Sequence, residues 1–220
     1  MTFDFQTPQG PFRPIRPIIL ASASPRRQSL LATCGLFFEV LPSSVSEPQP
    51  EQGEKPAEYA GRMAGLKAAD VRKRFSSGCI LAADTIVVHG SGVLGKPVSP
   101  EQALETLRSL NGQTHQVMTG CCLLDLDQDR HLTFSVVTEV TMARHSDEVL
   151  AAYVQTGEPM DKAGSYGIQG AGSFLVASIS GSYTNIVGLP VHESIQALLD
   201  WRVIQADSAT CAPQLSRSMA

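Results

Sequence analysis

Two serines and two arginines follow the first apolar run of the chain, a grouping that suits the binding of an anion. This run, residues 18–21, is typical of a buried strand. The helix after it is expected to begin at Ser24, a natural N-cap, with Pro25 in its first turn. A helix N-terminus offers free backbone N–H groups and a partial positive charge, to which Arg26 and Arg27 add formal charge. Ser22, Ser24 and both arginines are therefore candidate phosphate ligands.

A carboxylate follows the second strongly apolar run. Residues 79–83 are typical of a buried strand, which we expect to end at Asp84. Ligands of open α/β sheets bind beyond the carboxyl ends of the strands, so Asp84 would lie near the arginines if the two strands are parallel neighbours. Such a carboxylate can hold a divalent cation or take a proton from water, although a turn aspartate that accepts local N–H groups is an equal alternative. Glu47, in the polar loop 42–56, is a candidate metal ligand or a solvated loop acid.

Two lysines occupy positions from which they could reach a phosphate. Lys96 stands between Gly95 and Pro97, which place it on a rigid loop, and its ammonium could bind phosphate as a point charge. Lys67 lies among small residues of a helix expected over 57–75. The alternative for each is a solvated surface lysine, the commonest environment of this side chain.

A glycine-rich segment at 162–172 could approach a ligand through its backbone. Within it, Tyr166 offers a ring for stacking, and Gln169 offers both a hydrogen-bond donor and an acceptor, which suits the edge of a base. The alternative is an ordinary structural loop.

The remaining pattern predicts an α/β fold. Strands are expected at 18–21, 37–41, 79–83 (with 85–89 as a continuation or a second strand), 115–126, 132–143 and 174–179. Helices are expected at 28–34, 57–75, 100–110 (with Ser99 as its N-cap), 146–156 and 190–201. The long hairpin 115–143 among alternating strands and helices indicates a mixed, twisted sheet with flanking helices. Residues 18–204 are expected to form a single domain, between a proline-rich flexible tail at 1–17 and a small, polar flexible tail at 205–220.

The bulk composition argues against several classes of function. A net charge of −4 and a pI of about 5.7 weigh against binding to a nucleic acid polymer, which depends on phosphate neutralisation. No apolar run approaches the roughly 20 residues of a membrane span, and the N-terminal segment lacks the apolar centre of a secretory signal. The five cysteines have no C-x-x-C spacing, and no histidine pair has metal-ligand spacing. We therefore expect a cytoplasmic protein whose thiols are mostly buried and reduced.

Taken together, these segments resemble the Maf family of nucleoside triphosphate pyrophosphatases, also known as septum-formation inhibitor proteins. The resemblance spans 18–201 and rests on five ordered motifs: LASASPRR at 20–27, ADT at 83–85, GKP at 95–97, DKAGSYGIQG at 161–170 and VGLP at 187–190. It implies two lobes around a central cleft, as in inosine-triphosphate pyrophosphatases. It also implies hydrolysis of a nucleoside triphosphate to the monophosphate and pyrophosphate with Mg²⁺ or Mn²⁺.

The resemblance further implies a role for each candidate residue. Asp84 matches the catalytic acid/base residue of the family, and Glu47 matches the carboxylate that helps it hold the metal. The basic residues that hold the phosphates match Arg26, Arg27, Lys67 and Lys96.

Three positions distinguish the branches of the family, and here they are Arg26, Thr85 and Gln169. The branch that acts on 7-methyl-GTP tends to carry Trp, Gln and Glu there, so the chain resembles the branch that acts on dTTP and UTP, with modified pyrimidine triphosphates as further candidates. A neutral amide can pair with a pyrimidine edge, whereas a carboxylate suits the donor edge and positive charge of a methylated guanine. A non-catalytic nucleotide-binding regulator of cell division and a 7-methyl-GTP-type pyrophosphatase remain as alternatives, and the sequence leaves open whether the protein is a homodimer.

Overall fold

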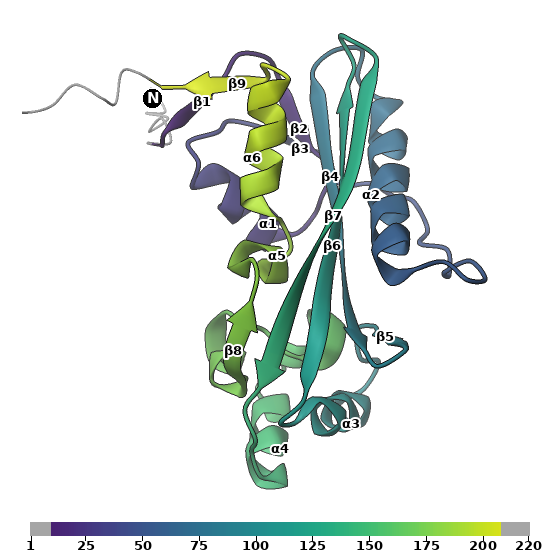
Figure 1. Cartoon of the computed structure of the whole chain (residues 1–220), viewed down its shortest axis with the longest axis vertical. Helices are drawn as coiled ribbons and strands as arrows, with labels where there is room; N and C mark the ends of the chain where they lie inside the picture. Colours follow the sequence, from purple (N-terminus) through teal and green to yellow (C-terminus); the bar gives the residue numbers. More distant parts are fainter. Residues whose placement is uncertain (1–9, 208–220) are drawn as a thin grey trace, which may run out of the picture.

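The computed structural model describes residues 10–207 and confirms an α/β fold with a mixed sheet (Figure 1). The strands are β1 (Phe12–Pro14), β2 (Ile18–Leu20), β3 (Glu39–Val40), β4 (Cys79–His89), β5 (Gly92–Leu94), β6 (Thr114–Asp125), β7 (Arg130–Met142), β8 (Val176–Ser180) and β9 (Ile204–Ala206). The helices are α1 (Pro25–Ala32), α2 (Pro56–Arg72), α3 (Pro100–Leu110), α4 (Asp147–Gln155), α5 (Tyr183–Val187) and α6 (Val191–Asp200). There are also three short 3₁₀ turns: η1 (Glu158–Asp161) lies directly before the glycine-rich segment, and η2 (Ala163–Ser165) and η3 (Gly170–Leu175) begin within it.

The larger sheet is parallel in one part and antiparallel in the other. Its strand order is β3-β2-β4-β6-β7-β8, with β5 paired to β4. The strands β3, β2 and β4 run parallel, whereas β4, β6, β7 and β8 are antiparallel neighbours. The expected long hairpin is confirmed as β6 and β7, which pair along their whole length. The expected caps are also confirmed, because the Ser24 and Ser99 side chains accept from backbone N–H groups at the starts of α1 and α3.

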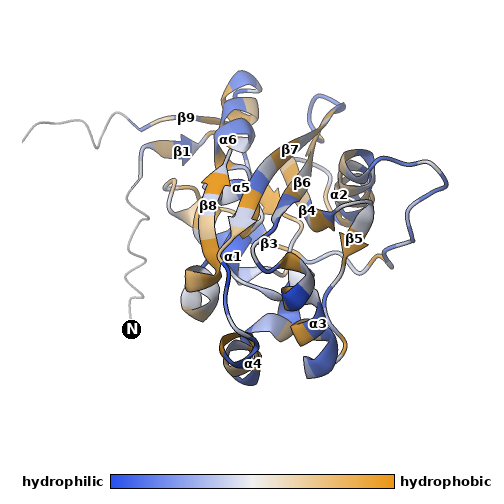
Figure 2. Ribbon diagram, turned by 60° about the horizontal axis from the view of Figure 1, so that its bottom comes forward, coloured by the Kyte–Doolittle hydropathy of each residue, from blue (hydrophilic) through white to orange (hydrophobic). Residues whose placement is uncertain are grey.

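Alternation along β4 directs its side chains into different clusters on the two faces of the sheet. Ile80 and Ala82 pack against α2, and further along the strand Ile86 packs against Ala60 of the same helix. On the opposite face, Leu81 belongs to a cluster with α1 and α6, and Val87 belongs to a cluster with α3 and α4. One helix therefore covers the first face, while two separate helix groups cover the ends of the second (Figure 1). The strands carry long apolar stretches, whereas α3 and α4 show both apolar and polar residues (Figure 2).

Of the two alternatives for 85–89, the continuation of the strand is confirmed, so the strand does not end at Asp84. Strand β4 continues to His89 because β6 pairs with it without interruption from Cys79 to Val88. On the other edge of β4 the pairing is interrupted. Strand β2 pairs with β4 only as far as Leu81, and β5 pairs with β4 from Val87 onward. Among the described residues, 82–86 therefore have a strand neighbour on one side only.

The expected tails at 1–17 and 205–220 are wrong for the residues nearest the domain. Strand β1 pairs antiparallel with β9, and Pro14 is accommodated opposite Ile204 because an edge strand tolerates a residue without an N–H. Both segments are therefore part of the folded unit. Residues 1–9 and 208–220, including Cys211, lie outside the described residues.

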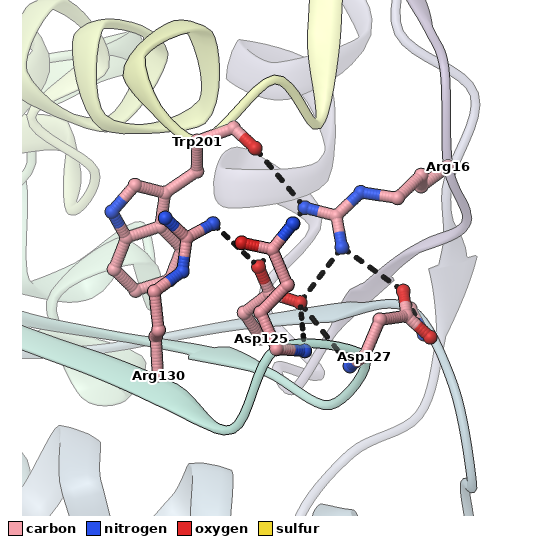
Figure 3. A network of polar contacts seen from close by, with 7 residues as sticks. Arg16, Asp125, Asp127, Arg130 and Trp201 are labelled. Atoms are coloured by element: carbon pink, nitrogen blue, oxygen red, sulfur yellow. Dashed lines mark hydrogen bonds and ion pairs between the residues drawn. The ribbon is translucent and has the colours of Figure 1, made fainter.

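An ionic network fixes the N-terminal segment to the hairpin (Figure 3). Arg16 donates to both carboxylate oxygens of Asp125, at 2.7 and 3.0 Å, and to the Trp201 carbonyl at 3.2 Å. Arg130 donates to Asp125 at 2.8 Å and lies over the Trp201 ring. The Asp125 side chain is completely buried, and the hydrogen bond from Arg16 is the main reason that its pKa lies well below the usual range.

Two further expectations concern the surroundings of the chain. Within 10–207 no helix is long and apolar enough to cross a bilayer. Cys79, Cys121 and Cys122 are buried free thiols, as expected, and Cys34 is a half-buried one.

Candidate active site

A cavity of about 470 Å³ lies at the open edge of β4. It brings together nearly all of the residues singled out in the sequence: Ser24, Arg26, Arg27, Glu47, Lys67, Asp84, Thr85, Lys96 and Gln169. The exception is Ser22, which does not line the cavity. Its buried hydroxyl accepts from the Ser24 backbone N–H at 3.2 Å and from Arg27 Nη1 at 3.3 Å. Ser22 therefore supports the phosphate-binding candidates from beneath and is not itself placed to contact a ligand.

Asp84 and Glu47 converge on one ammonium group. Lys67 Nζ lies 2.6 Å from Asp84 Oδ1 and 2.7 Å from Glu47 Oε1. Asp84 is only 8% exposed, so its carboxylate needs this compensation. The hydrogen bond from Lys67, together with the charge of Lys96, holds the pKa of Glu47 below its ordinary value. Two carboxylates from distant parts of the chain are thus brought together on one ammonium group.

Gly120 allows α2 to come close enough for this contact. It lies directly opposite Asp84 in the β4–β6 ladder, and a Cβ atom there would overlap the backbone of Ala60 in α2. The absence of a side chain lets the helix pack against the sheet beside Asp84, within reach of Lys67.

The same helix fastens the acidic loop that carries Glu47. Asp70 accepts from the hydroxyl of Ser43 at 2.9 Å and from the backbone N–H of Ser44 at 3.0 Å. At the other end of the loop, Arg62 binds Glu54 through two hydrogen bonds of 2.6 Å. The loop is therefore anchored on both sides of Glu47, which explains how a residue without regular structure reaches the site.

Arg27 is held firmly from three directions. Its guanidinium donates to the Gly188 carbonyl at 2.7 Å, to Thr85 Oγ1 at 3.0 Å and to the Ser22 hydroxyl. Burial lowers the pKa of Arg27 from its ordinary value, although the charge of Asp84 opposes this effect. An arginine remains protonated at neutral pH even so, and the rigid fork presents a fixed positive charge to the cavity.

Thr85 is tied into a buried polar group as well as to Arg27. Its hydroxyl lies 2.9 Å from that of Thr119, which donates to the Asn185 carbonyl at 3.0 Å. Asn185, in α5, is itself fully buried. The VGLP motif at 187–190 supplies the Gly188 carbonyl that orients Arg27.

Arg26 reaches across the cavity to the opposite wall. Its Nη1 lies 3.3 Å from Asp161 Oδ2, and Asp161 also accepts from Lys162 at 2.6 Å. Burial works against ionisation of Asp161, but the hydrogen bonds and charges of Lys162 and Arg26 outweigh it and hold its pKa below the ordinary value. The pairing connects α1 with η1, two elements on different sides of the cavity.

The lining of the cavity also has an apolar part, which we call the apolar wall. It includes Ile86, Val93, Leu94, Ile168, Ile186 and Val187. Gln169 is exposed, whereas Tyr166 is buried and directs its hydroxyl to His115 Nε2 at 2.8 Å. Tyr166 nevertheless lines the cavity, so its expected stacking role stays a prediction. Gln169 also lines the cavity, where its exposed amide could meet a base.

The acidic pair fits a divalent cation that is shared with a substrate. Mg²⁺ is commonly bound by one or two carboxylates together with phosphate oxygens, and Glu47 and Asp84 supply two carboxylates in a cavity lined by five basic side chains. Over residues 10–207 there is no cluster of three or more His, Cys, Asp or Glu that would form a site from protein ligands alone.

Some cavity residues received no role from the sequence. Tyr59, Asp161 and Lys162 line the cavity, and the last two belong to the DKAGSYGIQG motif. Their position at the start of the glycine-rich segment was the available signal. Tyr59 carried no signal beyond its place in the helix expected over 57–75.

Known proteins resemble this chain in sequence over most of its length. The model of the family described as Maf-like protein matches residues 17–201. A dTTP/UTP pyrophosphatase of Nitratidesulfovibrio vulgaris is 49% identical over 88% of this chain and 91% of its own length. Proteins of the same name are 43% identical in Oleidesulfovibrio alaskensis, over 93% of this chain and 94% of their own, and 49% identical in Methanosarcina mazei, over 80% and 90%. The chain belongs to the Maf family.

Proposed function

We propose that this protein hydrolyses dTTP and UTP to the monophosphate and pyrophosphate. The observation that carries the proposal is the convergence of Asp84 and Glu47 with Arg27, Lys67 and Lys96 around one cavity. The names of the relatives support the same activity, since all three proteins described above are dTTP/UTP pyrophosphatases.

The basic residues have the chemistry to bind the triphosphate. The N-terminus of α1 offers backbone N–H groups, and Arg26, Arg27 and Lys96 offer charge from both sides of the cavity. Lys67 can stabilise the negative charge that develops on the departing pyrophosphate, because its ammonium already lies beside the acidic pair.

Asp84 is the residue we assign to proton transfer. Its carboxylate can accept the proton of a water molecule that attacks the α-phosphorus, after which pyrophosphate departs. Mg²⁺ or Mn²⁺, held by Glu47 and Asp84, would neutralise phosphate charge when bound.

Gln169 and the apolar wall are assigned to the base. The amide can donate to a carbonyl oxygen and accept from an imide N–H, a combination that thymine and uracil both present. A largely apolar surround tolerates additional alkyl groups, so C5-modified pyrimidine triphosphates are further candidate substrates.

A pyrophosphate-release assay across dTTP, UTP, CTP, ATP, GTP and 7-methyl-GTP, with Mg²⁺ or Mn²⁺ and with EDTA, tests the proposal. We expect turnover of dTTP and UTP that EDTA abolishes. Preferred turnover of 7-methyl-GTP would favour the other branch of the family. Binding of nucleotide without product would instead favour a regulator of cell division.

A further inference from the structure

We propose that Glu158 is a positioning residue that sets base selection by holding the backbone on the C-terminal side of Gln169. The inference rests on the proposed role of Gln169 in contacting the base. Glu158 itself does not line the cavity, so any effect it has on the ligand must pass through other residues.

The Glu158 carboxylate collects hydrogen bonds from the segment that follows Gln169. Its Oε2 accepts from the Ala171 N–H at 2.9 Å, and its Oε1 accepts from the Gly172 N–H at 3.1 Å. Partial burial opposes the charge, but these backbone bonds prevail and hold the pKa of Glu158 below its ordinary value. A carboxylate that receives consecutive backbone N–H groups fixes the course of the chain at that point.

Tyr153 connects Glu158 to the backbone on the N-terminal side of Gln169. Its hydroxyl donates to Glu158 Oε1 at 3.0 Å and accepts from the Gly167 N–H at 3.1 Å. Gln169 thus lies between two backbone points that are both connected to one carboxylate. Its own side chain is exposed and lines the cavity, so its placement depends on the backbone on either side.

The glycines of this segment follow from the same arrangement. A Cβ at Gly170 would lie 2.8 Å from Glu158 Oε2, and one at Gly172 would lie 2.5 Å from the Tyr153 hydroxyl. Gly167 is similarly crowded by the side chains of Glu158 and Lys162. The glycines let the chain fold tightly around the Glu158 carboxylate. This packing explains why glycine is needed at these positions without any contact with a phosphate.

The replacement Glu158→Gln keeps the size of the side chain but removes one acceptor. Whichever way the amide turns, an N–H of the side chain then faces an N–H or O–H donor that the carboxylate now satisfies. We expect binding of the non-hydrolysable α,β-imido-dTTP to weaken about 10-fold, which is the size of one such hydrogen bond. Inhibition by inorganic tripolyphosphate, which has no base, should be unchanged.

A double-mutant cycle with Gln169→Ala tests whether Glu158 acts through Gln169. If it does, Glu158→Gln should have little effect on binding of α,β-imido-dTTP in the Gln169→Ala background. Additive losses would overturn the proposal, as would weaker inhibition by tripolyphosphate or a wild-type protein that does not bind the analogue. Because the cycle measures binding, a wild-type protein that binds without hydrolysis would refute the proposed function and leave this test intact.

Two further variants guard against a simple loss of folding. Tyr153→Phe keeps the packed ring and removes only the hydroxyl between Glu158 and Gly167, so it should reproduce the coupling to Gln169. Glu105→Gln changes an exposed carboxylate on α3 and should alter neither binding nor coupling. If Glu158→Gln melts far below the wild type, the double-mutant cycle is made with Tyr153→Phe and Gln169→Ala instead. Additive losses of binding in that cycle would overturn the proposal.

Discussion

Lys67 and Asp84 form a 2.6 Å ion pair at the point where the edge of β4 has no strand neighbour. The sheet opens there because β2 stops pairing at Leu81, and Gly120 lets α2 approach from the adjacent face. The catalytic candidate is therefore buried and still accessible from one edge, with its counter-charge supplied by a helix.

Replacing Lys67 by Ala should lower kcat/KM for dTTP about 100-fold, because both carboxylates lose their shared cation. Steady-state kinetics checks this expectation. The control is Lys73→Ala, which removes an exposed lysine just after the same helix and should leave kcat/KM within about 2-fold of the wild type. Equal effects of the two variants would show that the ion pair at Asp84 is not important.

Replacing Arg27 by Lys should not preserve activity despite the retained charge. An ammonium cannot reproduce the three directed bonds to Ser22, Thr85 and the Gly188 carbonyl, so the positive charge would no longer be fixed. We expect kcat/KM for dTTP to fall about 100-fold. A variant that keeps most of the wild-type kcat/KM would mean that charge alone is sufficient at this position.

Local patterns predicted most elements, since capping residues and alternation are properties of short segments. The caps at Ser24 and Ser99 and the hairpin of β6 and β7 are examples. Whether the strand continues past Asp84 could not be decided this way, because the continuation of β4 depends on pairing with β6, a strand distant in sequence. The β1–β9 pair was missed for the same reason.

The candidate site was likewise predictable in its residue types but not in its long-range contacts. Motifs indicated which residue types gather in the cavity, but they could not show that Ser22 would be buried beneath Arg27. Nor could they show that Lys67 would join Glu47 to Asp84, because that contact needs a loop, a helix and a strand in their final places.

The buried ion pair of Arg16 should contribute to stability in a pH-dependent way. Replacing Arg16 by Met removes one of the two arginines that hold Asp125 and should lower the free energy of unfolding at pH 7 by about 1–3 kcal/mol. Urea unfolding measures the loss. Arg72→Met breaks an exposed pair with Asp129 and should cost less than about 0.5 kcal/mol.

The direction of the pH effect follows from the depressed pKa of Asp125. The stabilisation is fully present above the pKa of an unfolded aspartate, about 3.9, and is lost as the pH falls towards the lower folded value. The difference between wild type and Arg16→Met should therefore be constant from pH 7 to about 5 and shrink below about pH 4. A difference that vanishes at neutral pH would contradict the role assigned to this pair.

Changing together two of the positions that distinguish the branches of the family, Thr85 and Gln169, should redirect selectivity. Gln169→Glu removes the amide donor, and Thr85→Gln replaces the hydroxyl that Arg27 contacts, so turnover of dTTP should fall about 10- to 100-fold. Pyrophosphate release from dTTP and 7-methyl-GTP measures the change. Unaltered dTTP turnover would mean that neither residue selects the base.

The central claim is that Asp84 performs the proton transfer, and Asp84→Asn tests it most directly. The amide keeps the shape of the side chain, but it is too weak a base to accept the proton of the attacking water. We expect kcat for dTTP to fall by about 10³-fold, while the Kd of α,β-imido-dTTP changes by less than about 5-fold. Near-wild-type turnover by Asp84→Asn, in a protein that still binds the analogue, would contradict the account.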